Sequence, residues 1–163
     1  MIKNNMSYGW LLLSLGLLAG CDQAPERAAS GELISEGTID AFQMKVGDCF
    51  NDEESRLMGP DDEVSSVPGV PCDQPHDNEV YAIFNLTFES WPGEDAAFEI
   101  ANQQCIENFA AFVGSDYYES SLDVLTLAPT DYGWKKLKDR EVICSVYDME
   151  ENKLIGSMRG RAI

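Results

Sequence analysis

The amino-acid sequence predicts an α+β fold in which one amphipathic helix packs on a mainly antiparallel sheet, with two disulfides. Three observations lead to this prediction. Residues 94–113 have helical periodicity, whereas shorter stretches before and after them have the composition of strands. Four cysteines, Cys49, Cys72, Cys105 and Cys144, follow the N-terminal region. Strands that precede and follow a single helix are typical of an α+β domain.

Residues 1–20 have the layout of a lipoprotein signal peptide. A short head with Lys3 precedes the apolar run 10–18, which is too short to span a bilayer, because spanning takes ~20 apolar residues. Small residues, Ala19 and Gly20, stand directly before Cys21. This pattern resembles the lipobox of bacterial lipoproteins, in which the cysteine thiol receives diacylglycerol carrying acyl chains such as palmitate. We therefore expect a protein lipid-anchored to the cell membrane through Cys21, with its domain on the extracytoplasmic side.

Residues 21–38 are mostly small or polar and show no periodicity. They are expected to form a lipidated flexible tether with a reach of roughly 20 to 25 Å. Asp22 resembles the residue that retains lipoproteins in the inner membrane of two-membrane bacteria. The folded domain is expected to span residues 39–163.

The charge of the chain excludes one class of partner. The sequence has 29 acidic and 11 basic residues. Removal of residues 1–20 takes away Lys3 and no acidic residue, which leaves 29 minus 10, or 19, excess negative charges. Nucleic acids and anionic lipid headgroups are negatively charged and bind through Lys and Arg, so they repel such a surface. We expect no nucleic-acid partner, attachment to the membrane through the lipid anchor, and a protein of the cell envelope as partner.

The domain is predicted to contain several strands around its helix. In the helix, one face carries Phe98, Ala101, Cys105, Phe109 and Phe112 at steps of three and four. Acidic residues begin this segment, and a glycine directly follows it. The predicted strands are 42–46, 64–70, 79–86, 121–127, 141–147 and 153–158, with residues 148–152 as the turn of a terminal hairpin.

An even set of four cysteines in an exported domain predicts two disulfides, for which three pairings exist. Cys105 and Cys144 both face apolar layers, so a bond between them would join the helix to the sheet. That leaves Cys49 to pair with Cys72. The alternative is a tetrathiolate zinc site, but the close cysteine pairs typical of such sites are missing.

The candidate polar residues are His76, Asp77 and Glu79. A histidine beside carboxylates is compatible with general-base catalysis, and an envelope hydrolase is the main alternative function. A His that follows Pro in a tight loop is more often structural, so we expect a partner-binding or structural role, no catalytic residue, no metal and no cofactor. A weaker alternative is a cation-binding module that uses the acidic stretches 51–54 and 60–63. An exposed aromatic patch near Trp91 or Trp134 would favour partner binding.

The segments 46–50 and 70–81 carry a family resemblance. The specific part is Cys-x-x-Pro-His-x-x-Glu-Val, which starts at Cys72. Later similar positions are Cys105, Phe109, Gly114, Pro129, Thr130, Trp134, residues 139–142, Cys144 and residues 156–160; Lys138 departs from the expected glycine. Over residues 44–160 the chain resembles the septum formation-related domain of exported bacterial proteins. The resemblance implies septum or cell-envelope biology, no established enzymatic activity and four cysteines consistent with two disulfides.

These observations together predict a membrane-anchored envelope lipoprotein. Residues 39–163 would be a septum formation-like domain that binds another envelope component without catalysing a reaction.

Overall fold

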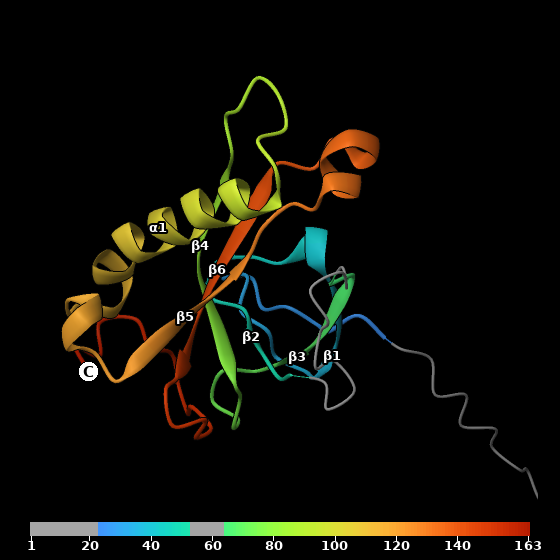
Figure 1. The fold of residues 1–163 in the computed structure, drawn as a ribbon. Coiled ribbons are helices and arrows are strands. Elements are labelled where there is room, and N and C mark those ends of the chain that lie inside the picture. Colours follow the sequence, from blue (N-terminus) through green and yellow to red (C-terminus); the bar gives the residue numbers. More distant parts are fainter. Residues whose placement is uncertain (1–22, 53–63) are drawn as a thin grey trace, which may run out of the picture.

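A computed structural model describes residues 23–52 and 64–163 of the chain (Figure 1). The predicted signal peptide, Cys21 and most of the two acidic stretches lie outside these residues. No helix in the described part of the chain is long and apolar enough to cross a membrane.

The sheet has the strand order β1-β3-β2-β4-β6-β5, and every adjacent pair is antiparallel. Its strands are β1 (Gly37–Asp40), β2 (Cys49–Phe50), β3 (Ser66–Val70), β4 (Asn78–Asn85), β5 (Leu122–Leu127) and β6 (Glu141–Asp148). With one main helix and two disulfides, this architecture confirms the predicted fold class.

Helix α1 spans Glu94–Val113 and lies across one face of the sheet (Figure 1). It ends at Gly114, which adopts a φ of 90° and donates its N–H to the carbonyl oxygen of Ala110. Glycine suits this position because the left-handed conformation carries no penalty without a Cβ. Both predicted ends of the helix are therefore correct.

The prediction that Phe98 belongs to the buried apolar stripe of the helix is wrong. Phe98 is 51% exposed, whereas its neighbour Ala97 is fully buried. Successive helical residues are ~100° apart, and the buried stripe runs through Ala97, Ala101 and Cys105 at steps of four. This stripe turns Phe98 toward the flank of the helix.

Apolar clusters cover both faces of the sheet. The cluster under α1 includes Tyr81, Phe109, Leu122, Val142 and Val146. On the other face, chain segments that precede β4 supply most of a second cluster: Leu33, Ile39, Met44, Phe50, Val67, Val80 and Ile143. The core is therefore divided between an α1 layer and a layer built mainly from residues that precede β4.

The predicted strand 42–46 is wrong. The chain forms a single 3-10 turn at Ala41–Gln43. The side chain of Asp40 accepts a hydrogen bond from the N–H of Phe42 at 2.9 Å and caps this turn. A local side-chain cap therefore prevails over the alternating pattern of apolar residues.

The predicted strand 153–158 and its hairpin are also wrong. Instead of pairing with β6, this segment makes one antiparallel bridge, between Leu154 and His76. The other predicted strands, 64–70, 79–86, 121–127 and 141–147, correspond to β3, β4, β5 and β6. The C-terminal segment thus lies beside the loop that precedes β4.

The predicted flexible tether is wrong for residues 23–38, because these residues pack on the domain. Leu33 is 5% exposed and bridges to Arg27, whose Nη2 donates to Oδ2 of the buried Asp48 at 2.7 Å. The carbonyl oxygen of Gln23 accepts from the N–H of Thr38 in β1 at 3.1 Å. A few specific contacts therefore hold a segment whose composition resembles a coil.

Candidate functional site

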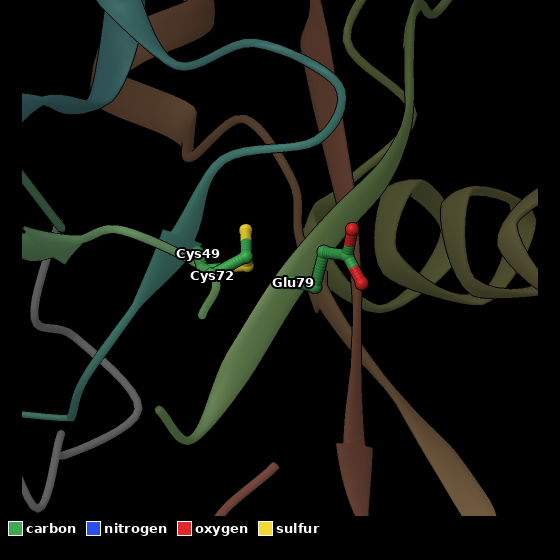
Figure 2. A group of neighbouring side chains, drawn as sticks. All are labelled: Cys49, Cys72 and Glu79. Carbon is green, nitrogen blue, oxygen red and sulfur yellow. A yellow bond between two sulfur atoms is a disulfide. The ribbon is translucent and has the colours of Figure 1, made fainter. Parts of the chain in front are cut away.

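The Cys-x-x-Pro-His-x-x-Glu-Val pattern maps to the loop between β3 and β4 and to the start of β4. Cys72, at the start of this loop, is bonded to Cys49 of β2, with 5.2 Å between their Cα atoms. Glu79 follows on β4, where it pairs in register with Cys49. Figure 2 shows the disulfide and the carboxylate of Glu79 as neighbours. The loop is thus fixed at both of its ends.

Glu79 is 1% exposed, and both of its carboxylate oxygens accept hydrogen bonds. Ser157 donates its hydroxyl to Oε1, and Met158 donates its backbone N–H to Oε2, each at 2.6 Å. Hydrogen bonds to a carboxylate are among the stronger ones in proteins. Glu79 therefore fastens the C-terminal segment to β4.

His76 is fully buried. Its Nδ1 donates to the carbonyl oxygen of Gln74 at 2.8 Å. Its backbone exchanges two hydrogen bonds with Leu154, at 3.1 and 2.8 Å. Its Nε2 makes no hydrogen bond with the described residues. The ring thus stabilises the turn before β4, and the backbone holds residue 154.

Asp77 lies beside His76 in sequence but makes different contacts. Its carboxylate pairs with the Lys153 ammonium at 2.7 Å and accepts the N–H of Asp52 at 2.9 Å. Within residues 23–52 and 64–163, no hydrogen bond joins the His76 ring to Asp77 or Glu79. The acid-base group considered from the sequence is therefore not assembled.

A hydrolase that used Glu79 would also need a nucleophile on the same face of the sheet as this carboxylate. The buried hydroxyl of Ser145 has no hydrogen-bond partner among the described residues, but Ser145 stands opposite Val80 in the sheet, whereas Glu79 stands opposite Val146. Successive residues of a strand point to opposite faces. Ser145 and Glu79 therefore lie on different faces of the sheet.

An open hollow of about 520 Å³ lies near the same loop. Its lining residues are Glu36, Gly37, Thr38, Asn51, Pro68, Gly69, Val70, Gln74 and Pro75. Neither His76 nor Glu79 lines it. The hollow therefore gives a substrate no access to these two side chains.

Both predicted disulfides are confirmed. The second joins Cys105 of α1 to Cys144 of β6, with 5.5 Å between Cα atoms. The sulfur atoms of Cys49 and Cys72 and a carboxylate oxygen of Glu79 lie within 4.8 Å of one another, a spacing compatible with metal ligands. A metal binds thiolates, however, and these sulfurs are bonded to each other. The group therefore does not fit a metal while the disulfide is intact.

Trp134 does not form an exposed aromatic patch. It is 5% exposed, its ring centroid lies 5.4 Å from that of Trp91, and the Arg140 guanidinium lies 3.4 Å above its ring. Stacking of this kind is a favourable cation-π contact. Trp134 is therefore a packing residue, and this position does not supply the exposed aromatic patch that would have favoured partner binding.

A polar cluster that the sequence did not reveal joins β5, β6 and the 3-10 turn Tyr117–Glu119 that precedes β5. Tyr117 and Tyr147 donate their hydroxyls to the two carboxylate oxygens of Asp123, at 2.6 and 3.1 Å. Burial by itself would raise the pKa of Asp123, but hydrogen bonds from Tyr117, the Val124 N–H and Tyr147 outweigh it and lower the pKa. The hydrogen bond to Asp123 raises the pKa of Tyr117 to about 12. The sequence carries little signal for this cluster, because Tyr117 is 6 positions from Asp123 and Tyr147 is 24 positions from it.

Comparison with known proteins gives one result. The family model described as "Septum formation" matches residues 27–144, more than half of the chain. No curated protein and no solved structure matches the chain. The matched region begins inside the packed N-terminal segment and ends at Cys144, so it includes both disulfides and the buried His76 and Glu79. The chain therefore belongs to the septum formation family, which points to a role related to the septum or the cell envelope.

Proposed function

We propose that the protein is an envelope lipoprotein, anchored through Cys21, whose domain binds another envelope protein and catalyses no reaction. The observation that carries the non-catalytic part is the burial of His76 and Glu79. Catalysis requires groups that can reach a substrate. Both carboxylate oxygens of Glu79 and the Nδ1 atom of His76 are instead occupied by contacts within the protein.

The sequence before Gln23 supports the anchor. A cationic head, a short apolar run and Ala19-Gly20-Cys21 form the pattern of a lipoprotein signal. Each buried methylene contributes about 0.8 kcal/mol, and two or more acyl chains give stable attachment.

Mass spectrometry of the mature N-terminus tests the anchor. We expect a chain that starts at lipid-modified Cys21, and we expect the variant Cys21→Ser to leave the membrane fraction. An unmodified Cys21, or cleavage at another position, would contradict the anchor. Lys3→Arg serves as a control, because it keeps the charge of the signal segment.

Cross-linking in whole envelopes tests the binding role. The excess of negative charge favours a partner with a basic surface. We expect the wild-type chain to be cross-linked to one such protein, with a yield that falls as salt rises, because salt screens surface charges. A salt-independent set of unrelated proteins would count against a specific partner. The described residues add no support to a hydrolase or to a cation-binding module.

A further inference from the structure

The ordered part of the chain begins very close to the expected anchor. Gln23 is hydrogen-bonded to Thr38 of β1 and is separated from Cys21 only by Asp22. An extended chain spans at most ~3.6 Å per residue, so the Cα atoms of Cys21 and Gln23 lie within about 7 Å. A free tether over residues 21–38 would instead reach roughly 20 to 25 Å.

Close packing fixes the first ordered residues on the domain. A methyl group on Gly37 would overlap the carbonyl oxygen of Gln23 and the backbone of Pro25. The N–H of Glu26 donates to Ser35 Oγ at 2.8 Å. The segment that leads from the anchor therefore lies against the edge of β1.

We propose that the domain lies directly on the lipid surface in one fixed orientation; this inference rests on the proposed lipidation of Cys21. To the membrane-proximal face we assign three exposed apolar side chains of the first segments, Ile34, Phe42 and Val46. These side chains are 57%, 52% and 45% exposed. Exposed apolar side chains gain free energy when they enter the interfacial region of a bilayer.

Contacts connect this face to the start of the domain. The N–H of Ile34 donates to the carbonyl oxygen of Glu26 at 2.9 Å. The loop that carries Val46 is held to the N-terminal segment through the ion pair of Arg27 with Asp48. In Figure 1 these first segments, in blue and cyan, lie on the side opposite to the C-terminal end of α1. The anchor therefore brings this side of the molecule to the bilayer.

Charge makes the contact dependent on the anchor. Glu32, Glu36 and Asp40 belong to the same first segments as Ile34 and Phe42, and all three acidic residues are exposed. Anionic headgroups repel such carboxylates. A short covalent link raises the effective concentration of a weak contact into the millimolar range or so. We therefore expect no vesicle binding by the Cys21→Ser variant and a lasting contact by the lipidated chain.

Tryptophan fluorescence in vesicles tests the orientation. The mature, lipidated chain is reconstituted into phosphatidylcholine vesicles with or without bromine on the acyl chains. We expect bromine to quench the added indole of Ile34→Trp and to leave that of Tyr118→Trp unchanged. The 84% exposed Tyr118 follows the C-terminal end of α1 in the chain, and that end of α1 lies on the side opposite to the first segments (Figure 1). The wild-type chain supplies the background of Trp91 and Trp134.

A linker variant provides the matched control. Insertion of ~20 Gly and Ser residues after Asp22 gives a coil with a reach of about 22 to 27 Å, and the quenching of Ile34→Trp should disappear while the lipid stays on Cys21. Equal quenching of Ile34→Trp and Tyr118→Trp in a chain whose Cys21 carries lipid would overturn the orientation and leave the proposed anchor intact. An unmodified Cys21 would overturn the proposed function itself.

Discussion

Among single residues, Glu79 meets the usual condition for burying a polar group, whereas only Nδ1 of the two ring nitrogens of His76 is hydrogen-bonded within the described residues. An unpaired buried carboxylate is costly, and hydrogen bonds to both of its oxygens offset that cost. Glu79 receives such bonds from the Ser157 hydroxyl and the Met158 N–H. Glu79 and the backbone of His76, both in the Cys-x-x-Pro-His-x-x-Glu-Val pattern, therefore hold the C-terminal segment 154–158 against the start of β4.

His76→Ala should lower the free energy of unfolding by about 1 to 3 kcal/mol, because it leaves the carbonyl oxygen of Gln74 without its partner. Gln74→Ala is the control, since it retains that carbonyl oxygen and changes only an exposed side chain. Urea unfolding of both variants, beside an envelope phenotype, gives the measurement. A His76→Ala protein of unchanged stability that has lost its function would favour the catalytic alternative.

The Asp123 cluster should make stability depend on pH in the acid range. Because hydrogen bonding lowers the pKa of Asp123 in the folded state, its contribution is present above the unfolded pKa of about 3.9 and is lost as pH falls through the folded pKa. Tyr117→Phe should move this pKa upward and cost roughly 0.5 kcal/mol, the low end for a solvent-screened hydrogen bond. NMR titration of the Asp123 carboxyl group, with Tyr118→Phe as control, checks the direction. A downward shift in Tyr117→Phe would contradict hydrogen bonding as the cause of the lowered pKa.

Among the elements, α1 is attached to the sheet by chemistry as well as by packing. Cys105 is bonded to Cys144 of β6, and the hydroxyl of the buried Tyr81 in β4 donates to the carbonyl oxygen of Cys105 at 2.6 Å. Burial raises the pKa of Tyr81, so the phenol stays protonated and remains a donor. Two central strands therefore hold one turn of the helix.

Removal of this disulfide with Cys105→Ala and Cys144→Ala should lower the free energy of unfolding by ~4 kcal/mol, and removal of the other bond with Cys49→Ala and Cys72→Ala by ~3.4 kcal/mol. The bonds close loops of 39 and 23 positions, and the longer loop restricts the unfolded chain more. Chemical denaturation of the two double variants gives both values. A protein lacking the Cys105 bond with wild-type stability would show that packing alone holds α1.

For the molecule as a whole, the N-terminal segment decides how the domain meets its surroundings. Residues 23–36 complete the second core layer through Leu33 and hold the buried Asp48 through Arg27. The packed part of the chain therefore already includes Gln23, and the proposed lipid on Cys21 would leave the domain little freedom relative to the membrane.

Arg27→Ala should lower the free energy of unfolding by about 2 kcal/mol, because it removes the charged partner of a buried carboxylate. Lys45→Ala is the control, since the backbone N–H of this exposed residue still donates to Asp48. Thermal melting and hydrogen exchange over residues 23–36 give the measurement. If Arg27→Ala matches Lys45→Ala in both, the N-terminal segment is not fixed by this ion pair.

The features that the sequence predicted correctly have short-range signals. The helical periodicity predicted both ends of α1 correctly, and the glycine that follows the helix indicated where it ends. The inward faces predicted for Cys105 and Cys144 led to the correct disulfide pairing. The alternation of apolar and polar residues over 42–46 predicted a strand, but the Asp40 side chain caps a 3-10 turn at this place instead. Aromatic side chains gave no sign of their exposure, so burial of Trp134 under Arg140 was not foreseen.

The sequence by itself determined the α+β class, the bounds of α1, the pairing of the cysteines and the excess of negative charge, because each depends on periodicity, parity or composition along the chain. Only the tertiary structure decided that Glu79 holds Met158 and that Arg27 holds Asp48. These partners are 79 and 21 positions apart. Contacts over such separations leave no local pattern, because their free energy is realised only when the chain has already folded back on itself.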